Sequence, residues 1–290
     1  MSKLDNKLDP RVNAYNENVA AAYLEGKVDA KTYVPAVRYQ VRMPVVPLHN
    51  KPANASMMET QLLIGSEFDV YDLHGSWLWG QEVQADRKGY VGYVPKMALM
   101  PSRYEPTHRI SNLRAPAFLK ANFKSAIRTS LPMNAKLLAE DEEGDYIRML
   151  DVGYVHKNHV VELGQEPTDF VEAAELHFGL PYIWGGVSPD GVDCSGLVQT
   201  ALRACGLDAP RDAGMQETTL GTSVEITEKL TGLVRGDLIF WTGHVGIMGD
   251  REMLLHANAH HMCVAIEPLR DAAARIAQTT GVITSIKRIL

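Results

Sequence analysis

Three side chains in the second half of the sequence could perform nucleophilic catalysis together: Cys194, His244 and His256. A thiol attacks a carbonyl carbon as a thiolate, and a free pKa of about 8.5 leaves only a small fraction ionised at neutral pH. A helix N-terminus and a nearby histidine each lower a thiol pKa. The sequence provides the first of these, because the Gly-rich loop 185–191 precedes Cys194 and an apolar helical pattern follows it. We therefore expect Cys194 to begin a helix as an activated nucleophile.

The two histidines lie on neighbouring apolar runs that predict strands. His244 opens the run to Met248, and His256 ends the run that starts at Met253. A tight turn at Gly249–Asp250 would pair these strands and bring the imidazoles side by side. His244 would then be the base, and His256 would hold its ring in the useful tautomer.

A zinc site made of the same three residues is the alternative. No carboxylate or second cysteine lies at ligand spacing, so we predict no metal. Cys205 and Cys263 are expected to be buried and inert. Three cysteines without a CxxC pair argue against a disulfide framework.

The elements around these residues predict an α+β catalytic core. Residues 169–178 read as a helix, with Thr168 as its N-cap and Gly179 after its end. The cysteine helix and an antiparallel sheet from residue 236 onward follow. A helix packed on an antiparallel sheet is the layout of papain-like catalytic cores.

The first half of the chain predicts small β-domains. Short apolar runs separated by turn residues fill residues 37–100, in the order of a bacterial SH3 domain. The segment Gly153–Val160, GYVHKNHV, stands where Gly89–Lys96, GYVGYVPK, stands in the first copy, which indicates a second barrel. The predicted domains are a helical arm at 1–36, SH3-like barrels at 37–100 and 101–164, and a catalytic domain at 165–290.

The bulk properties exclude several classes of partner. The chain has 290 residues and a net charge of −6, so neither nucleic acid nor an anionic membrane is an expected partner. No window reaches the ~20 apolar residues of a membrane span. Asp9, Arg11 and Glu17 interrupt any secretory apolar stretch, so we expect a cytoplasmic protein.

Several motifs in order resemble the NlpC/P60 family of cysteine peptidases. They are DCSGLVQ (Asp193–Gln199), GDLIFW (Gly236–Trp241), HVGIM (His244–Met248), LLHA (Leu254–Ala257) and PYIWGG (Pro181–Gly186). The resemblance implies that Tyr182 helps to stabilise the oxyanion, together with the Cys194 amide, and that no cofactor is needed.

The order of domains resembles the γ-D-glutamyl-L-diamino acid endopeptidases within this family. That resemblance implies a small murein peptide substrate, L-Ala-γ-D-Glu-diamino acid, with a free N-terminal L-Ala, and a role in recycling wall peptides. In Pro210-Arg211-Asp212, it implies that Asp212 binds the ammonium, and it places Arg211 and Ser195 at the substrate. Ala213 departs from the family's usual serine. The first SH3 domain is expected to contribute Glu59 and Tyr90, with Tyr93 as a substitute for Tyr90.

Two other functions stay open at the level of sequence. One is a non-catalytic wall-binding SH3 protein with an inactive peptidase core. The other is a papain-like amidase or acyltransferase with another substrate. The preference for diaminopimelate or lysine and the oligomeric state are not predicted.

Overall fold

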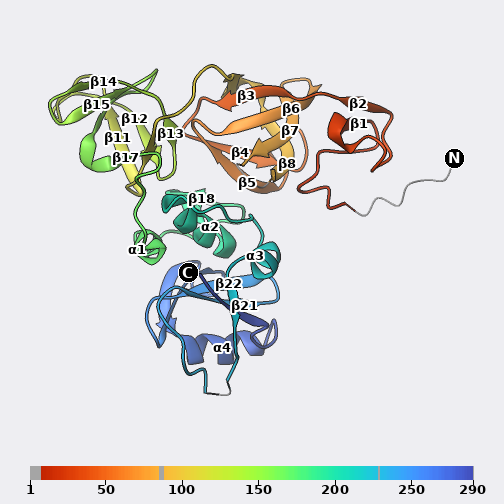
Figure 1. Ribbon diagram of the computed structural model, residues 1–290, viewed down its shortest axis with the longest axis vertical. Coiled ribbons are helices and arrows are strands. Elements are labelled where there is room, and N and C mark those ends of the chain that lie inside the picture. The colour runs from red at the N-terminus through yellow and green to blue at the C-terminus, as the bar shows by residue number, and fades with distance from the viewer. Residues whose placement is uncertain (1–7, 85–87, 228, 290) are drawn as a thin grey trace. The chain divides into compact units, whose positions relative to one another are not determined.

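A computed structural model describes residues 8–84, 88–227 and 229–289 and divides the chain into two compact units, Met1–Val161 and Glu162–Leu290 (Figure 1). The predicted boundary at residues 164 and 165 lies three residues after this division. Each unit is described by itself below.

The N-terminal segment is not the helical arm that the sequence predicted, as far as residues 8–36 show. It contains β1 (Val19–Ala21), the single-turn helix η1 (Ala22–Leu24) and β2 (Thr32–Val34), with β1 parallel to β2. The Asn16 side chain accepts hydrogen bonds from the amides of Asn18 and Val19, both at 2.9 Å. Such side-chain turns compete with helix formation. The alanines of β1 are buried in a cluster with Trp79, so the segment packs on the first β-domain.

The first β-domain is a seven-stranded sheet in the order β5-β4-β8-β7-β6-β3-β9. Buried residues alternate along β4 and the first part of β6, whereas β7 is buried from Trp77 to Glu82, and one core lies around Phe68 and Leu48. Residues 42–44 separate β3 from β4. The elements are β3 (Val37–Val41), β4 (Val45–His49), β5 (Met58–Leu63), β6 (Glu67–His74), β7 (Trp77–Val83), β8 (Lys88–Pro95), η2 (Lys96–Ala98) and β9 (Leu99–Pro101).

The second β-domain repeats the end of the first. A strand, a 3-10 turn and a strand follow one another as β8, η2 and β9, and again as β16, η3 and β17. A five-stranded and a three-stranded sheet enclose a separate core that includes Leu131 and Met149. The elements are β10 (His108–Ile110), β11 (Arg114–Phe118), β12 (Ile127–Pro132), β13 (Lys136–Leu137), β14 (Ala139–Glu143), β15 (Tyr146–Met149), β16 (Gly153–His156), η3 (Lys157–His159) and β17 (Val160–Glu162).

The second unit has the predicted α+β layout. A six-stranded antiparallel sheet has the order β20-β25-β21-β22-β23-β24. Its elements are α1 (Phe170–Glu175), β18 (Val187–Ser188), β19 (Gly191–Val192), α2 (Cys194–Ala204), α3 (Ala213–Thr219), β20 (Thr222–Val224), β21 (Asp237–Trp241), β22 (His244–Met248), β23 (Met253–Asn258), β24 (Cys263–Pro268), α4 (Leu269–Ala277) and β25 (Ser285–Arg288).

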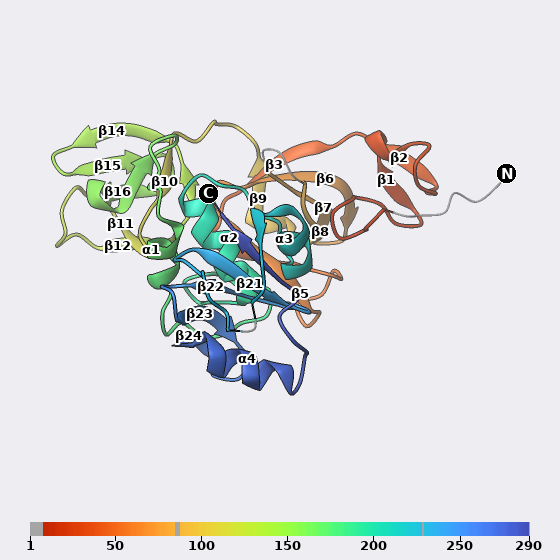
Figure 2. The same ribbon diagram turned by 60° about the horizontal axis from the view of Figure 1, so that its bottom comes forward.

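Two helices cover opposite faces of this sheet. Figures 1 and 2 show α2 on one side of β21 and β22 and α4 on the other. On the α4 side, Leu269 and Ala272 pack against Trp241, Met248 and Leu254. Helix α2 contacts β22 and β23. The helix that begins at Cys194 therefore packs on the strand that begins at His244.

Helix α1 is shorter than predicted, and its cap is a different residue. It spans six residues, and Asp169 rather than Thr168 is the N-cap, accepting from the amides of Val171 at 2.8 Å and Glu172 at 3.3 Å. A carboxylate at this position also favours the helix dipole. Within the described residues, no helix has both the length and the apolar character needed to cross a membrane.

Candidate active site

The nucleophile candidate Cys194 is the first residue of α2, as predicted. The Asp193 side chain caps this helix by accepting a hydrogen bond from the Gly196 amide at 2.7 Å. Its other oxygen accepts from the Gly185 amide at 2.8 Å, which ties the Gly-rich loop to the helix. A Cβ on Gly196 would lie 2.1 Å from the Gly186 carbonyl oxygen, so the close approach of loop and helix requires glycine there. The loop thus fixes where Cys194 begins the helix.

A buried ion pair holds this helix end. Arg211 donates to both carboxylate oxygens of Asp193, at 2.8 and 2.5 Å, and the two side chains are 6% and 8% exposed. Arg211 also donates to the Ser195 hydroxyl at 3.1 Å. Bidentate Arg–carboxylate pairs combine charge with fixed geometry. Arg211 and Ser195, predicted to bind substrate, are therefore buried partners of the helix N-terminus, and their contacts serve to position Cys194.

The thiol of Cys194 is 7% exposed and lies against the start of β22. Its sulfur is 4.0 Å from the Gly243 carbonyl oxygen, and the amides of Val245 and Ser195 donate to it. These amides and Arg211 lower its pKa, but burial, reinforced by the Asp193 charge, outweighs them and raises the pKa to about 12. The expected lowering of the thiol pKa is therefore wrong for the substrate-free protein.

The two imidazoles lie side by side, as predicted. His244 Nε2 and His256 Nδ1 are 2.9 Å apart, and the ring centroids are 5.2 Å apart. The register Ile247↔Leu255 puts Gly246 opposite His256, so His244 is its diagonal neighbour on the same face. A Cβ on Gly246 would lie 3.1 Å from the His256 Cβ. The missing side chain at Gly246 gives the His256 ring room to reach His244.

His244 has one ring nitrogen left for the thiol. Its neighbours in sequence, Gly243 and Val245, both touch the Cys194 sulfur through their main chains. Among the described residues, no hydrogen bond joins that sulfur to the His244 ring. Burial, followed by the neighbouring His256, lowers the pKa of His244 to about 3. The thiol and the imidazole are thus both neutral before substrate binds, which suits proton transfer during the attack itself.

The chain of hydrogen bonds continues past His256 to two residues that the sequence analysis missed. His256 Nε2 is 2.8 Å from Glu267 Oε1, and Arg275 donates to the two oxygens of Glu267 at 2.5 and 2.6 Å. His256 pairs with Ala265, so Glu267, two residues further along β24, lies on the same face. Strand alternation could have indicated Glu267, but nothing in the sequence indicates that Arg275 of α4 reaches it.

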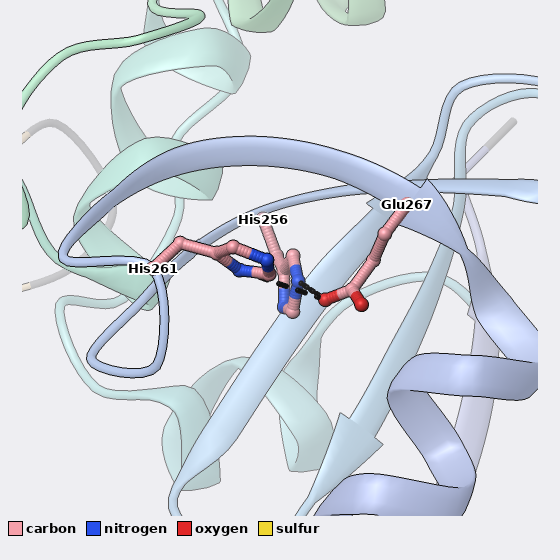
Figure 3. A group of neighbouring side chains, drawn as sticks. All are labelled: His256, His261 and Glu267. Atoms are coloured by element: carbon pink, nitrogen blue, oxygen red, sulfur yellow. Dashed lines mark hydrogen bonds and ion pairs between the residues drawn. The ribbon is translucent and has the colours of Figure 1, made fainter.

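A group of possible metal ligands overlaps this chain. Figure 3 shows His256 and His261 turned towards the Glu267 carboxylate. The possible ligand atoms of these three residues lie within 4.8 Å of one another. His261 is exposed at the surface, and its Nδ1–H donates a hydrogen bond to Asn258 Oδ1, 3.1 Å away. Arg275 already occupies both oxygens of Glu267, which opposes a cation at the same place. We interpret the group as an ion pair and hydrogen-bond network.

Tyr182 lies close enough to the thiol for their charges to interact. It is half-buried and held by a main-chain hydrogen bond to the Met262 carbonyl at 3.0 Å. Burial raises the pKa of Tyr182, and the charges of Cys194 and Asp193 raise it further. A phenol that keeps its proton can donate to an oxyanion. As the first residue of α2, Cys194 also has an amide without an intrahelical partner.

The remaining predicted residues lie in different settings. Asp212 is half-buried and directly precedes α3. Glu59 on β5 and Tyr90 on β8 belong to the other unit. Tyr90 is 4% exposed inside the core of the first β-domain, whereas the substitute, Tyr93, is half-buried at the surface. Burial leaves Tyr90 little surface for a substrate, so Tyr93 is the better candidate of the two.

Comparisons with known proteins give this geometry a context. The model of the NlpC/P60 family matches residues 179–280, and that of the bacterial dipeptidyl-peptidase Sh3 domain matches residues 48–99. The γ-D-glutamyl-L-lysine dipeptidyl-peptidase of Bacillus cereus is 30% identical over 246 residues, covering 74% of this chain and 72% of its own length. The Bacillus subtilis protein of the same name is 28% identical over 222 residues, covering 70% and 73%.

A solved structure has the same fold over most of the chain. It is that of an NlpC/P60 family protein from Bacillus cereus, with a TM-score of 0.74 and 22% identity. The match covers 87% of this chain and 99% of that one. The order along the chain, a β-rich region followed by a catalytic domain, is therefore shared.

Replacing Arg211 tests the ion pair. Arg211→Met should destabilise the protein by about 3–5 kcal/mol, because the Asp193 carboxylate stays buried without its partner. Arg235→Met is the matched control in the same unit: its ion pairs with Glu175 and Asp169 are exposed and should cost about 1 kcal/mol or less. Urea denaturation measures both, and equal losses would contradict the proposed role.

The ionisation of Cys194 can be read directly. With its pKa raised to about 12, the substrate-free protein should show no thiolate absorbance from Cys194 at neutral pH, and the band should grow only in strong alkali. The measurement is the ultraviolet difference spectrum between the wild-type chain and Cys194→Ala during a pH titration. A thiolate band at pH 7 that the substitution removes would show an ion pair with imidazolium instead.

Proposed function

We propose, from the premise that this chain belongs to the NlpC/P60 family of cysteine peptidases, that it hydrolyses the γ-D-glutamyl–diamino acid bond of murein peptides with a free N-terminal L-Ala. At the coarser level the protein is a peptidoglycan peptidase resembling the γ-D-glutamyl-L-lysine dipeptidyl-peptidases. The bond, the free amine, recycling of wall peptides and the cytoplasmic location belong to the proposal.

One observation carries the catalytic part: a thiol at a helix N-terminus lies against the strand end that bears a hydrogen-bonded imidazole pair. In the proposed reaction, the Cys194 proton moves to His244 Nδ1 while Sγ bonds to the γ-carbonyl carbon of D-Glu. In this step the thiol exchanges its contact with the Gly243 carbonyl for one with the His244 ring.

The second half of the reaction returns each group to its starting state. The C–N bond breaks, and His244 passes its proton to the departing amine of the diamino acid. His244 then takes a proton from water, which attacks the thioester, and Sγ leaves and is reprotonated. The Tyr182 phenol and the Cys194 amide are the proposed donors to the oxyanion in both steps. The scheme uses no cofactor.

Recognition of a free amine requires a nearby carboxylate, because a buried ammonium without a partner is costly. Asp212 is the proposed partner in the catalytic unit, two residues after Pro210 and next to the buried Arg211. Glu59 and an SH3-domain tyrosine stay predictions from the family resemblance. The similar relatives are named for a lysine-containing bond, so lysine is one candidate for the diamino acid.

Removal of the thiol tests the catalytic assignment. Cys194→Ala should lower the release of diamino acid from L-Ala-γ-D-Glu-L-Lys and its diaminopimelate counterpart by at least about 10⁴-fold, because no other group forms the thioester. Cys205→Ala, a half-buried cysteine at the other end of α2, is the control and should retain activity. Turnover by the Cys194→Ala chain would refute the mechanism, and circular dichroism checks its folding.

Blocking the amine tests the substrate assignment. N-acetylation of the tripeptide should lower kcat/KM by about 10²-fold or more, the usual effect of losing one partner of a desolvated charge pair. Asp212→Asn should lower activity on the free peptide and reduce this discrimination. Equal turnover of the free and acetylated peptides would favour a different papain-like amidase activity. If the chain cleaves neither peptide although its Cys194 thiol is reactive, the substrate is a different one.

A further inference from the structure

The base His244 is the first member of a hydrogen-bonded chain of four side chains from four elements. His244 of β22 bonds His256 of β23, His256 bonds Glu267 of β24, and Glu267 bonds Arg275 of α4. His256 is fully buried and Glu267 is 12% exposed, so the bond between these two side chains is shielded from water. Each bond in such a chain restricts the proton positions in the next.

The proton positions on the two imidazole rings follow from the Glu267 carboxylate. An ionised carboxylate only accepts hydrogen bonds, so His256 must carry its proton on Nε2, which faces Glu267. The Nδ1 of a neutral His256 is then a lone pair, and it accepts from His244 Nε2. A neutral His244 with its proton on Nε2 has a lone pair on Nδ1. That is the atom that must take the proton from Cys194.

Arg275 keeps His256 singly protonated, which the Glu267 carboxylate alone would not do. A bare carboxylate beside His256 would favour the doubly protonated ring, whose Nδ1–H would reverse the bond to His244 and put a proton on the wrong nitrogen of the base. Burial lowers the pKa of His256, Glu267 raises it, and Arg275 and His261 lower it. Arg275 also holds the pKa of Glu267 down at about 2, so the carboxylate stays an acceptor across the neutral range.

We propose that Glu267, held by Arg275, is a positioning residue that sets the tautomers of His256 and His244 and thereby makes His244 Nδ1 the base. The groups that face His256 are His244 on β22, Glu267 on β24, Arg275 on α4 and His261 from the loop before β24; Asp271 acts on Arg275. This inference rests on the proposed function for the role of His244, but its first readout requires no substrate.

The first measurement is the tautomer of each ring in the substrate-free chain. Long-range ¹H–¹⁵N spectra of the full chain with ¹⁵N-histidine distinguish Nε2–H from Nδ1–H. In the wild type, both His244 and His256 should be Nε2–H. A wild-type His244 with its proton on Nδ1 overturns the proposal without any variant.

Glu267→Gln is the decisive variant. Its amide oxygen should turn to Arg275 and its NH₂ to His256, which reverses the chain and puts the proton of both rings on Nδ1. We expect kcat/KM to fall by about 10²- to 10⁴-fold with KM little changed, the size of general-base and tautomer losses in other enzymes. Glu267→Asp keeps an acceptor and should restore the Nε2–H tautomers and part of the activity.

The matched control is Glu175→Gln, which removes the same charge from the exposed pair with Arg235 in the same unit. It should leave both tautomers and activity unchanged.

Arg275→Gln should let His256 become doubly protonated, so the acid limb of the pH–activity profile moves to higher pH. Arg275→Lys keeps the positive charge and should restore the wild-type profile. Unchanged tautomers in Glu267→Gln, or changed tautomers with activity equal to that of Glu175→Gln, overturn the proposal.

If the murein peptide proves not to be the substrate, the rate of Cys194 alkylation by iodoacetamide replaces turnover. The tautomers and their response to Glu267→Gln would then still decide the inference. Failure of the substrate assignment and failure of the positioning role are thus separate outcomes.

Discussion

The buried pair between Asp193 and Arg211 is the contact on which the geometry of the nucleophile depends. The same carboxylate caps α2, holds the Gly-rich loop through the Gly185 amide and neutralises the guanidinium. Two charges at this depth are tolerated only because each satisfies the other, and a break in the pair would leave an uncompensated charge beside Cys194. The second pair, Glu267 with Arg275, ends the hydrogen-bonded chain of the histidines. A guanidinium–carboxylate pair thus fixes each half of the catalytic apparatus.

Burial sets the charge states of the reacting side chains, Cys194 and His244, that these two ion pairs hold in place. It raises the pKa of the Cys194 thiol and lowers that of the His244 imidazole, so the resting site carries no charge on its reacting atoms. The charges on Asp193 and Arg211, and those on Glu267 and Arg275, are held in two ion pairs. A site of this kind is preorganised for charge that develops during the reaction, which is where electrostatic stabilisation has the largest effect on rate.

Local rules predicted the elements well where one strong signal dominated. The apolar face after Asp193 predicted α2, and the repeated GYV segments predicted two β-domains, because periodicity and turn residues act over a few positions. Local rules failed where polar side chains compete to accept hydrogen bonds from backbone amides. Asn16 turns the N-terminal segment away from a helix, and Asp169 rather than Thr168 caps α1, since a carboxylate is favoured at that end.

The sequence by itself determined the family motifs, the helix that begins at Cys194 and the hairpin that pairs His244 with His256, because these depend on neighbours within about a dozen residues. Only the tertiary structure decided that Arg211 and Ser195 are buried at the helix end, that Tyr90 lies in a core, and that Arg275 reaches Glu267. Those contacts join separate elements. Their formation depends on how sheet and helices pack, and the same packing sets the burial that reverses the expected shift in the thiol pKa.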